Sequence, residues 1–323
     1  MKTSTKNATK PEPPAAEVYA ARRSDIAEEI NTDHRNGDYL PGIALPKSLT
    51  ASTEVAEVLN GASQVYISVP SQSLRANLEE WGSLLPKDAI IVSLMKGVEK
   101  DSGLRMSEVI QQVTGVSAEK ICVVSGPNLS LEIAAEEPTA SVASSVSEET
   151  RTAVAEAASN EYFTTFTNED VIGTEFGGIL KNLIAVAIGI VNGVGYGQNT
   201  KASIMTRGLA ELTRFAVAYG AEEKTMVGLA GLGDLIATSE SSLSRNHKAG
   251  EMLGKGYTLR EVQRRMAQTA EGLSSVAPIL QLAKAKHVSM PIVEQVQLVL
   301  EGRMNPRDIA PHLTHAADGP VDE

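Results

Sequence analysis

The chain has 323 residues, 42% of them hydrophobic and 4% aromatic, and a formal net charge of −11. This length suggests about two domains, each with room for a core. The negative charge argues against nucleic acid or an anionic membrane as a bulk partner, although it allows a local basic pocket. The single cysteine, Cys122, excludes an internal disulfide and lies in an apolar run typical of a core residue.

The first half predicts an α/β domain. Residues 1–16 are polar and proline-rich, without the apolar segment of a signal peptide, and we expect them to be disordered. A short strand is expected at 17–21, with Arg22 and Arg23 at its end and a helical stretch after it. Helical patterns at 73–85 and 104–113 alternate with buried strands, which favours a parallel doubly wound sheet. The further strands are expected at 64–70, 89–94, 120–125, about 141–146 and about 162–167.

The second half predicts helices alone. Strand signals end near residue 171, and helical periodicity continues to about residue 312. The apolar run at 179–190 is too short to span a bilayer, which needs about 20 apolar residues, so we expect no membrane insertion and a soluble cytoplasmic protein. The predicted division is a disordered head at 1–16, an incomplete dinucleotide-binding α/β domain at 17–168, a helical substrate domain at 169–312 and a disordered tail at 313–323.

Lys181 is the strongest candidate for a functional residue. It lies in the stretch G-T-E-F-G-G-I-L-K-N-L-I-A-V-A-I-G-I, which we interpret as a buried helix with a lone lysine. Burying a cation is costly without a partner, and desolvation lowers the pKa of a lysine toward neutral pH. Such a lysine can accept a proton, so we expect it to lie in an active site.

A second stretch, G-L-A-G-L-G-D-L-I-A-T followed by S-R-N, supplies partners for this lysine. Asp234 starts an apolar helix, where its carboxylate would either cap the helix or hold an ammonium group. Ser244, Arg245 and Asn246 precede another helical stretch. They suit a phosphate, although a polar loop with an ordinary cap would have the same composition.

Loops at the ends of the predicted strands are further candidates, because ligands bind at the carboxyl edge of such sheets. Ser71 and Gln72 begin a helix, where simple capping is an equal alternative. Lys96 follows the next strand, although a lone loop lysine is usually only solvated. The Gly126-Pro127 turn beside Asn128 and Ser130 would form a phosphate cradle or an ordinary tight turn. The five histidines show no metal-ligand spacing, and we predict no metal.

These motifs, in this order, resemble those of the bacterial NAD(P)-dependent glycerol-3-phosphate dehydrogenase family. The similar segments are S-L-M-K-G, S-G-P-N, G-T-E-F-G-G-I-L-K-N, G-L-A-G-L-G-D-L-I-A-T, S-R-N and A-E-G, together with A-R-R-S-D-I-A-E-E-I-N-T-D-H-R-N-G-D-Y-L-P-G-I-A-L-P. The resemblance extends from about residue 17 to residue 309. It implies an α/β Rossmann-like domain followed by an all-helical domain.

The resemblance also implies an activity and a set of site residues. Lys181 would be the general base in reversible hydride transfer between NAD(P)H and dihydroxyacetone phosphate or sn-glycerol 3-phosphate, supplying glycerol phosphate for phospholipid synthesis. The positions similar to the family's substrate-binding residues are Lys96, Gly126, Asn128, Lys181, Asp234, Ser244, Arg245 and Asn246. The positions similar to its cofactor-binding residues are Arg22, Arg23, Lys96, Ser130, Arg245, Thr269 and Glu271.

The two arginines after the first predicted strand bear on the choice of cofactor. An acidic residue there would select NAD(H), whereas Arg22 and Arg23 suit a 2′-phosphate, so we expect NADP(H) or NAD(H) with NADPH preferred. The expected partner is a small phosphorylated substrate, with no nucleic acid. Apolar helical domains of this kind often dimerise, which leaves a homodimer open.

The chain departs from the family pattern at its start. The family begins with a strand, a G-x-G-x-x-G turn and a helix, whereas no glycine precedes Glu17 here. That turn holds the cofactor pyrophosphate, and the strand is central in the sheet. Our hypothesis is a truncated or mis-started enzyme that folds poorly or is inactive, which wild-type-like turnover of residues 1–323 would contradict. The alternatives are a non-catalytic relative that binds a phosphorylated metabolite or a protein partner, and a dehydrogenase of the hydroxy-acid type.

Overall fold

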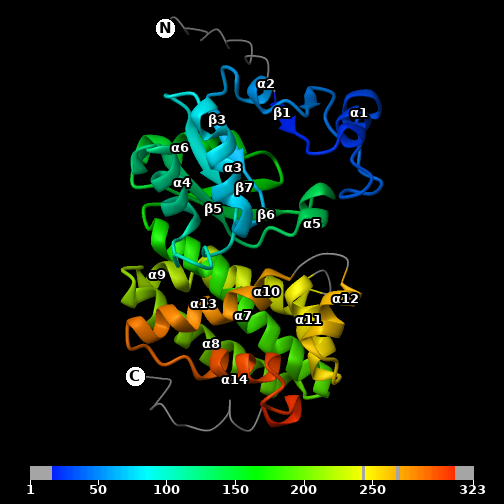
Figure 1. Ribbon diagram of the computed structural model, residues 1–323, viewed down its shortest axis with the longest axis vertical. Coiled ribbons are helices and arrows are strands. Elements are labelled where there is room, and N and C mark those ends of the chain that lie inside the picture. The colour runs from blue at the N-terminus through cyan, green and yellow to red at the C-terminus, as the bar shows by residue number, and fades with distance from the viewer. Residues whose placement is uncertain (1–16, 242–243, 267–269, 310–323) are drawn as a thin grey trace, which may run out of the picture. The chain divides into compact units, whose positions relative to one another are not determined.

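The computed structural model describes residues 17–241, 244–266 and 270–309. Internal contacts divide the chain into two compact units, residues 1–60 and 61–323 (Figure 1). The predicted disordered head and tail and Thr269 lie outside the described residues.

The N-terminal unit is a small parallel βαβ arrangement. Strand β1 (Glu17–Ala20) pairs in parallel with β2 (Leu49–Ser52), and α1 (Ser24–Asp33) and α2 (Val55–Leu59) follow the two strands. The side chain of Asn31 on α1 donates to the carbonyl oxygen of Ala51 and accepts from its N–H, both at 2.8 Å. Strand β2 was not predicted, because its sequence L-T-A-S is short and has only one large apolar residue.

The second unit contains a five-stranded sheet in the order β3-β4-β5-β6-β7. Its neighbours pair in parallel, as predicted for a doubly wound sheet, except β5 and β6, which are antiparallel. The reason lies in the β5–β6 connection, where α5 has five residues and turns the chain back instead of crossing the sheet. The strands are β3 (Gln64–Ile67), β4 (Ile90–Ser93), β5 (Ile121–Ser125), β6 (Thr139–Ser144) and β7 (Phe163–Asn168), and α5 is Ser130–Ala134.

Helices cover both faces of this sheet (Figure 1). Ile91 packs with the helices α3 and α4, whereas its neighbour Val92 packs on the other face with α6, as the alternation of a strand requires. Cys122 is fully buried in this second cluster, and burial raises the pKa of its thiol to about 12. The elements between the strands are η1 (Ser71–Ser73), α3 (Leu74–Trp81), η2 (Gly82–Leu84), α4 (Met106–Thr114), η3 (Ala118–Lys120) and α6 (Glu148–Ala158).

From residue 171 onward the described residues contain helices and no strand. They comprise α7 (Val171–Val194), α8 (Gln198–Ala218), α9 (Glu223–Met226), the π-helix η4 (Leu229–Gly233), α10 (Asp234–Glu240), α11 (Arg245–Gly254), α12 (Leu259–Arg265), α13 (Glu271–Ala285), α14 (Pro291–Leu300) and η5 (Pro306–Asp308). This agrees with the expected change from an α/β to a helical region.

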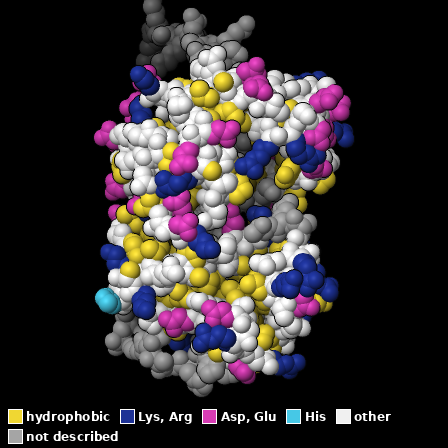
Figure 2. All heavy atoms as spheres, in the orientation of Figure 1, with side chains coloured by type: hydrophobic (Ala, Val, Ile, Leu, Met, Phe, Trp, Pro, Cys, Tyr) yellow, Lys and Arg dark blue, Asp and Glu magenta, His cyan; other side chains and the backbone are white. Residues whose placement is uncertain are grey.

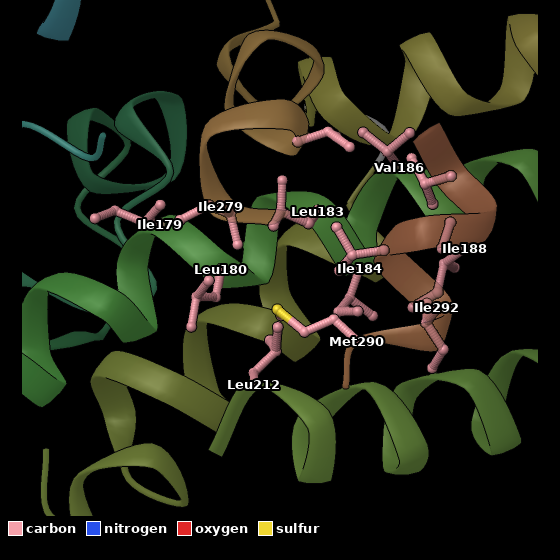
Figure 3. Packing of buried hydrophobic residues seen from close by; sticks show 14 of the residues in the cluster. Ile179, Leu180, Leu183, Ile184, Val186, Ile188, Leu212, Ile279, Met290 and Ile292 are labelled. Carbon is pink, nitrogen blue, oxygen red and sulfur yellow. The ribbon is translucent and has the colours of Figure 1, made fainter. Parts of the chain in front are cut away.

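Helix α7 is the centre of the helical part. Asp170 caps it by accepting from the N–H of Gly173 at 2.7 Å. Its apolar side chains pack against residues of α8, α13 and α14 (Figure 3). By length and composition α7 could cross a membrane, but 83% of its most apolar window is buried by protein, as in the core helix of a folded domain.

The backbones of helices α7 and α11 lie in direct contact. Gly189 of α7 lies against Gly250 of α11, and Gly193 lies against Gly254 in the same way. A Cβ atom at Gly250 would lie only 2.1 Å from the carbonyl oxygen of Val186. The glycines therefore let α11 lie close enough for its first turn to reach the lysine-bearing part of α7.

Candidate active site

The centre of the site is a buried carboxylate between two lysines. Asp234, at the start of α10, accepts from Lys181 of α7 at 2.8 Å through Oδ1 and from Lys96 at 2.5 Å through Oδ2. The Lys181 and Asp234 side chains are 9% and 3% exposed. Lys96 follows β4 and also donates to the carbonyl oxygen of Gly126, 3.1 Å away at the end of β5. Four segments far apart in sequence thus meet at one point.

Thr238 completes the surroundings of Lys181. Its Oγ1 atom lies 2.5 Å from Lys181 Nζ and 3.1 Å from Asp234 Oδ1. Residues four apart on a helix share a face, so Asp234 and Thr238 of α10 present two oxygen atoms to the same ammonium group. Sequence reasoning did not identify Thr238, because a threonine in an apolar helix has no distinguishing signal.

The environment of Lys181 lowers its pKa from 10.5 to about 8. Burial is the largest cause, and the positive charges of Lys96 and Arg245 act in the same direction, whereas Asp234 opposes them. Burial pushes the pKa of Asp234 upward, but the two lysines outweigh it and hold that pKa below its usual value. An ionised carboxylate therefore faces a lysine that can change protonation state near physiological pH.

Helix α11 brings a second group of polar side chains to α7. Ser244 caps α11 through its hydroxyl, which accepts from the N–H of His247 at 3.2 Å. Asn246 donates to Oδ1 of Asn182, the neighbour of Lys181, at 2.8 Å and accepts from the N–H of Gly272 at 2.9 Å. Asn246 thus links the starts of α11 and α13 to the lysine-bearing turn of α7. Asn182 was not predicted as a site residue.

Glu271 begins α13 and belongs to the same charged group. Burial raises the pKa of its carboxyl. The charge of Arg245, a hydrogen bond from the backbone of Ser71, and the charges of Lys96 and Lys181 oppose this rise. It thus shares an electrostatic environment with both lysines. Ser71 is buried, and a Cβ at Gly97 would lie 2.5 Å from its Oγ, so its loop packs tightly beside the loop of Lys96.

Two buried oxygen atoms near the end of β5 have no hydrogen-bond partner within the described residues. They are Ser125 Oγ and Asn128 Oδ1. Buried polar atoms are normally paired, so these two suit a bound polar group. Ser125 Oγ is 2.6 Å from the position that a Cβ would take at Gly178 of α7, and the Asn128 amide is oriented by donating to Ser141 Oγ at 3.2 Å.

The predicted residues other than Asn128, Ser244, Asn246 and Thr269 fall into three groups. Lys96, Gly126, Lys181 and Asp234 are joined by direct contacts, and Arg245 and Glu271 act on the lysines electrostatically. Ser130 is the exposed first residue of α5. Arg22 and Arg23 belong to the N-terminal unit, where Arg23 pairs with Asp25 at 2.5 Å and Asp38 at 2.8 Å.

Lys and Arg side chains are interspersed with Asp and Glu on the face in Figure 2. The positive charge of the site is therefore a local feature in an acidic chain. Within the ranges that the structure describes, no three His, Cys, Asp or Glu residues are grouped as metal ligands.

Known proteins resemble both halves of the chain. Residues 12–151 match the family model for the NAD-dependent glycerol-3-phosphate dehydrogenase N-terminus, and residues 170–311 match the model for its C-terminus. A glycerol-3-phosphate dehydrogenase (NAD(P)+) of Leifsonia xyli is 62% identical over 92% of this chain and 80% of its own length. One from Streptomyces griseus is 52% identical over 87% of this chain and 84% of its own length.

The fold agrees with these sequence matches. The crystal structure of glycerol-3-phosphate dehydrogenase from Coxiella burnetii has a TM-score of 0.85 and 32% identity, covering 91% of this chain and 89% of that one. Because these relatives are named as dehydrogenases, the alternative of a non-catalytic relative is not favoured. The chain belongs to the NAD-dependent glycerol-3-phosphate dehydrogenase family.

Proposed function

We propose that the chain is a glycerol-3-phosphate dehydrogenase that transfers hydride reversibly between NAD(P)H and dihydroxyacetone phosphate or sn-glycerol 3-phosphate. The observation that supports this best is Lys181, a buried lysine with a pKa of about 8 that contacts an ionised aspartate. A general acid or base is most effective when its pKa is near the working pH. The relatives described above carry the same activity in their names.

Lys181 handles the proton in this reaction. In the oxidative direction neutral Lys181 accepts the proton of the 2-hydroxyl group, and in the reductive direction its ammonium donates a proton to the carbonyl oxygen. Asp234 and Thr238 orient its Nζ atom through their contacts at 2.8 Å and 2.5 Å. Asp234 stays ionised throughout and stabilises the protonated lysine, since both lysines keep its pKa low.

The substrate phosphate is assigned to the start of α11. Arg245 and Asn246 occupy the first turn of this ten-residue helix, after the cap Ser244. Backbone N–H groups at a helix N-terminus and a guanidinium group favour a phosphate. Lys96 adds a second positive charge, and Gly126 and Asn128 contribute polar atoms at the end of β5.

The chain's residues fit a nicotinamide cofactor, which when bound supplies or accepts the hydride. Ser130, Lys96, Arg245 and Glu271 would hold it on the second unit, together with Thr269, and the unpaired Asn128 Oδ1 suits a carboxamide or hydroxyl group. Arg22 and Arg23 would hold a 2′-phosphate on the N-terminal unit, and NADPH is the preferred cofactor. Arg22 is exposed, whereas Arg23 shares its guanidinium with two aspartates.

The proposal also covers the roles of the two parts of the chain, its oligomeric state and its location in the cell. The α/β part at 17–168 binds the cofactor and the helical part at 169–312 binds the substrate. The enzyme works in the cytoplasm as a homodimer without membrane insertion, and its product feeds phospholipid synthesis. Gel filtration with light scattering tests the dimer.

The test of the activity uses the purified chain of residues 1–323. Because the relatives are named as dehydrogenases, we expect turnover in place of the inactive chain that the missing glycine turn first suggested. NADPH oxidation, followed by absorbance, should depend on dihydroxyacetone phosphate and be lost in Lys181→Met. Calorimetry with glycerol 3-phosphate and with NADPH accompanies the assay. Substrate binding without cofactor binding or turnover would contradict the proposal and favour a binding protein.

A further inference from the structure

Helix α7 carries a second buried charge that the mechanism does not use. Glu175 lies less than two helical turns before Lys181 and is 4% exposed. Its carboxylate accepts from Arg105 Nη1 at 2.5 Å, from Ser107 N–H at 3.0 Å and from Ser107 Oγ at 2.6 Å. Burial raises the pKa of this carboxyl, while Arg105 and Ser107 oppose the rise. Sequence reasoning overlooked Glu175 by treating the stretch as uncharged except for its lysine.

The contacts of Glu175 hold one end of the segment 96–105 against α7, and Lys96 lies at the other end of that segment. Residues 96–105 fold back so that Val98 and Arg105 form an antiparallel bridge, and the N–H of Glu99 donates to Leu104 at 2.8 Å. Val98 is 1% exposed and belongs to the same hydrophobic cluster as residues of α7. Val98, two residues after Lys96, is therefore linked to α7 in two steps: its backbone pairs with Arg105, and Arg105 contacts Glu175 of α7.

Little room is left for Lys96 to adopt another position. Its Cγ and Cδ atoms would lie 3.3 Å from a Cβ at Gly178 of α7, so its aliphatic part runs against the helix backbone. Its ammonium group shares Asp234 with Lys181. A shift of the segment along α7 would therefore change the distance from Lys96 to Asp234.

We propose that Glu175 is a positioning residue: by holding the start of α4 against α7 it fixes Lys96 beside Asp234 and Lys181. Its effect on the site passes through Lys96. The charges that face Lys181 are Asp234 from α10, Lys96 from the β4–α4 loop, Arg245 from α11 and Glu271 from α13. Glu175 instead acts on the backbone that carries one of them.

The consequence is a measurable change at Lys181. If Lys96 moves away, Lys181 loses a neighbouring cation and gains a larger share of Asp234. Both changes favour its charged form, so the pKa of Lys181 rises from about 8. A residue that only stabilises the fold would leave this titration in place.

Glu175→Gln is the test, because it removes the negative charge while keeping the size of the side chain. We expect the pKa of Lys181 to rise by about one unit, measured by NMR titration of protein labelled with 13C at lysine Cε. The Lys181 signal is assigned by its absence in Lys181→Met. An unchanged Lys181 titration in folded Glu175→Gln protein overturns the proposal.

Glu211→Gln is the matched control. Glu211 of α8 is also a buried carboxylate that holds the start of a helix, accepting from the N–H groups of Ile292 and Val293 in α14 at 3.0 Å and 3.2 Å. This variant removes a buried charge outside the site and is expected to leave the Lys181 titration unmoved. If Glu175→Gln does not fold, Ser107→Ala removes one hydrogen bond from the same carboxylate and is expected to shift the titration in the same direction. An unshifted titration in that variant would also overturn the proposal.

Kinetics add a second readout that rests on the proposed function. We expect KM for the phosphorylated substrate to rise about tenfold in Glu175→Gln, the loss of about one charged hydrogen bond from Lys96. A purely structural role would lower kcat and the active fraction with KM unchanged. Absence of turnover in the wild-type chain would contradict the proposed function alone, since the NMR titration still decides the role of Glu175.

Discussion

The ion pairs around Lys181 and those of the N-terminal unit join similar residues at similar distances, but they differ in burial and therefore in their effect on stability and chemistry. Lys181 and Asp234 are almost completely buried. Burial lowers the pKa of Lys181 against the effect of Asp234, while the two lysines hold the pKa of Asp234 low against the effect of burial. Arg23 makes equally short contacts with Asp25 and Asp38, but all three side chains are more than half exposed. Water screens such surface pairs, so they contribute little to stability or chemistry. The comparison predicts large effects for changes at the buried centre and small ones at the surface.

The largest effect is expected for Lys181→Met. Loss of the proton carrier should lower kcat by about 10³-fold, within the range for a general acid or base. The melting temperature should fall, since the buried Asp234 carboxylate keeps Lys96 but loses one of its two cationic partners. Enzyme assays and thermal unfolding measure both quantities. Lys255→Met is the control, because Lys255 is exposed and pairs with Glu251 of the neighbouring turn of α11. A near-normal kcat in Lys181→Met would contradict the prediction.

Glu211 extends the comparison to a buried carboxylate outside the site. Burial raises its pKa from 4.5 to about 7, so the folded state binds the proton more tightly than the unfolded chain. Its contribution is fully present below pH 4.5 and is lost as pH rises through about 7. The loss is about 3 kcal/mol at most. Urea unfolding of wild type and Glu211→Gln at pH 5 and pH 8 should show a smaller pH dependence in the variant; equal dependence would refute this role.

A backbone contact gives the third test. Gly250→Ala would place a Cβ 2.1 Å from the carbonyl oxygen of Val186, forcing α11 away from α7. We expect a loss of about 2 kcal/mol in the free energy of unfolding and weaker substrate binding, because Arg245 and Asn246 move with the helix. Gly197→Ala is the control, since within the described residues no atom beyond its chain neighbours lies within 4 Å of the added Cβ. Equal stability of the two variants would show that the helices can separate without cost.

The smallest effect is expected at the N-terminal unit. Arg22→Gln should raise KM for NADPH about tenfold and leave KM for NADH unchanged, because one charged hydrogen bond to a 2′-phosphate is lost. Arg23→Gln should change KM for NADPH less, since Asp25 and Asp38 already engage its guanidinium. Steady-state kinetics with both cofactors measure the difference. A larger effect at Arg23 would reverse this assignment.

The sequence predicted single residues whose burial would cost much free energy without a partner. A lysine within an apolar helix requires a partner, and Asp234 was named as that partner before the contact was known. Lys96 could not be assigned on the same basis, because a loop lysine carries no burial signal. Thr238 and Glu175 needed the helix faces and their neighbours to be known.

The fold was predictable where local patterns decide it. Alternating strands and helices indicated the α/β part, and the loss of strand signals after residue 171 indicated the helical part. The direction of β6 and the existence of β2 depend on tertiary pairing rather than on local composition. The close contact of Gly189 with Gly250 likewise requires the positions of two helices far apart in sequence.

The most direct test of the central claim is the pH dependence of kcat/KM for oxidation of glycerol 3-phosphate. Neutral Lys181 is the proton acceptor in this direction, so the rate should rise with pH and level off above about 8. Reduction of dihydroxyacetone phosphate should show the opposite dependence, since it needs the ammonium form. A profile without a bend near pH 8, or with a bend only near the ordinary lysine value of 10.5, would contradict the assignment of Lys181 as the proton carrier.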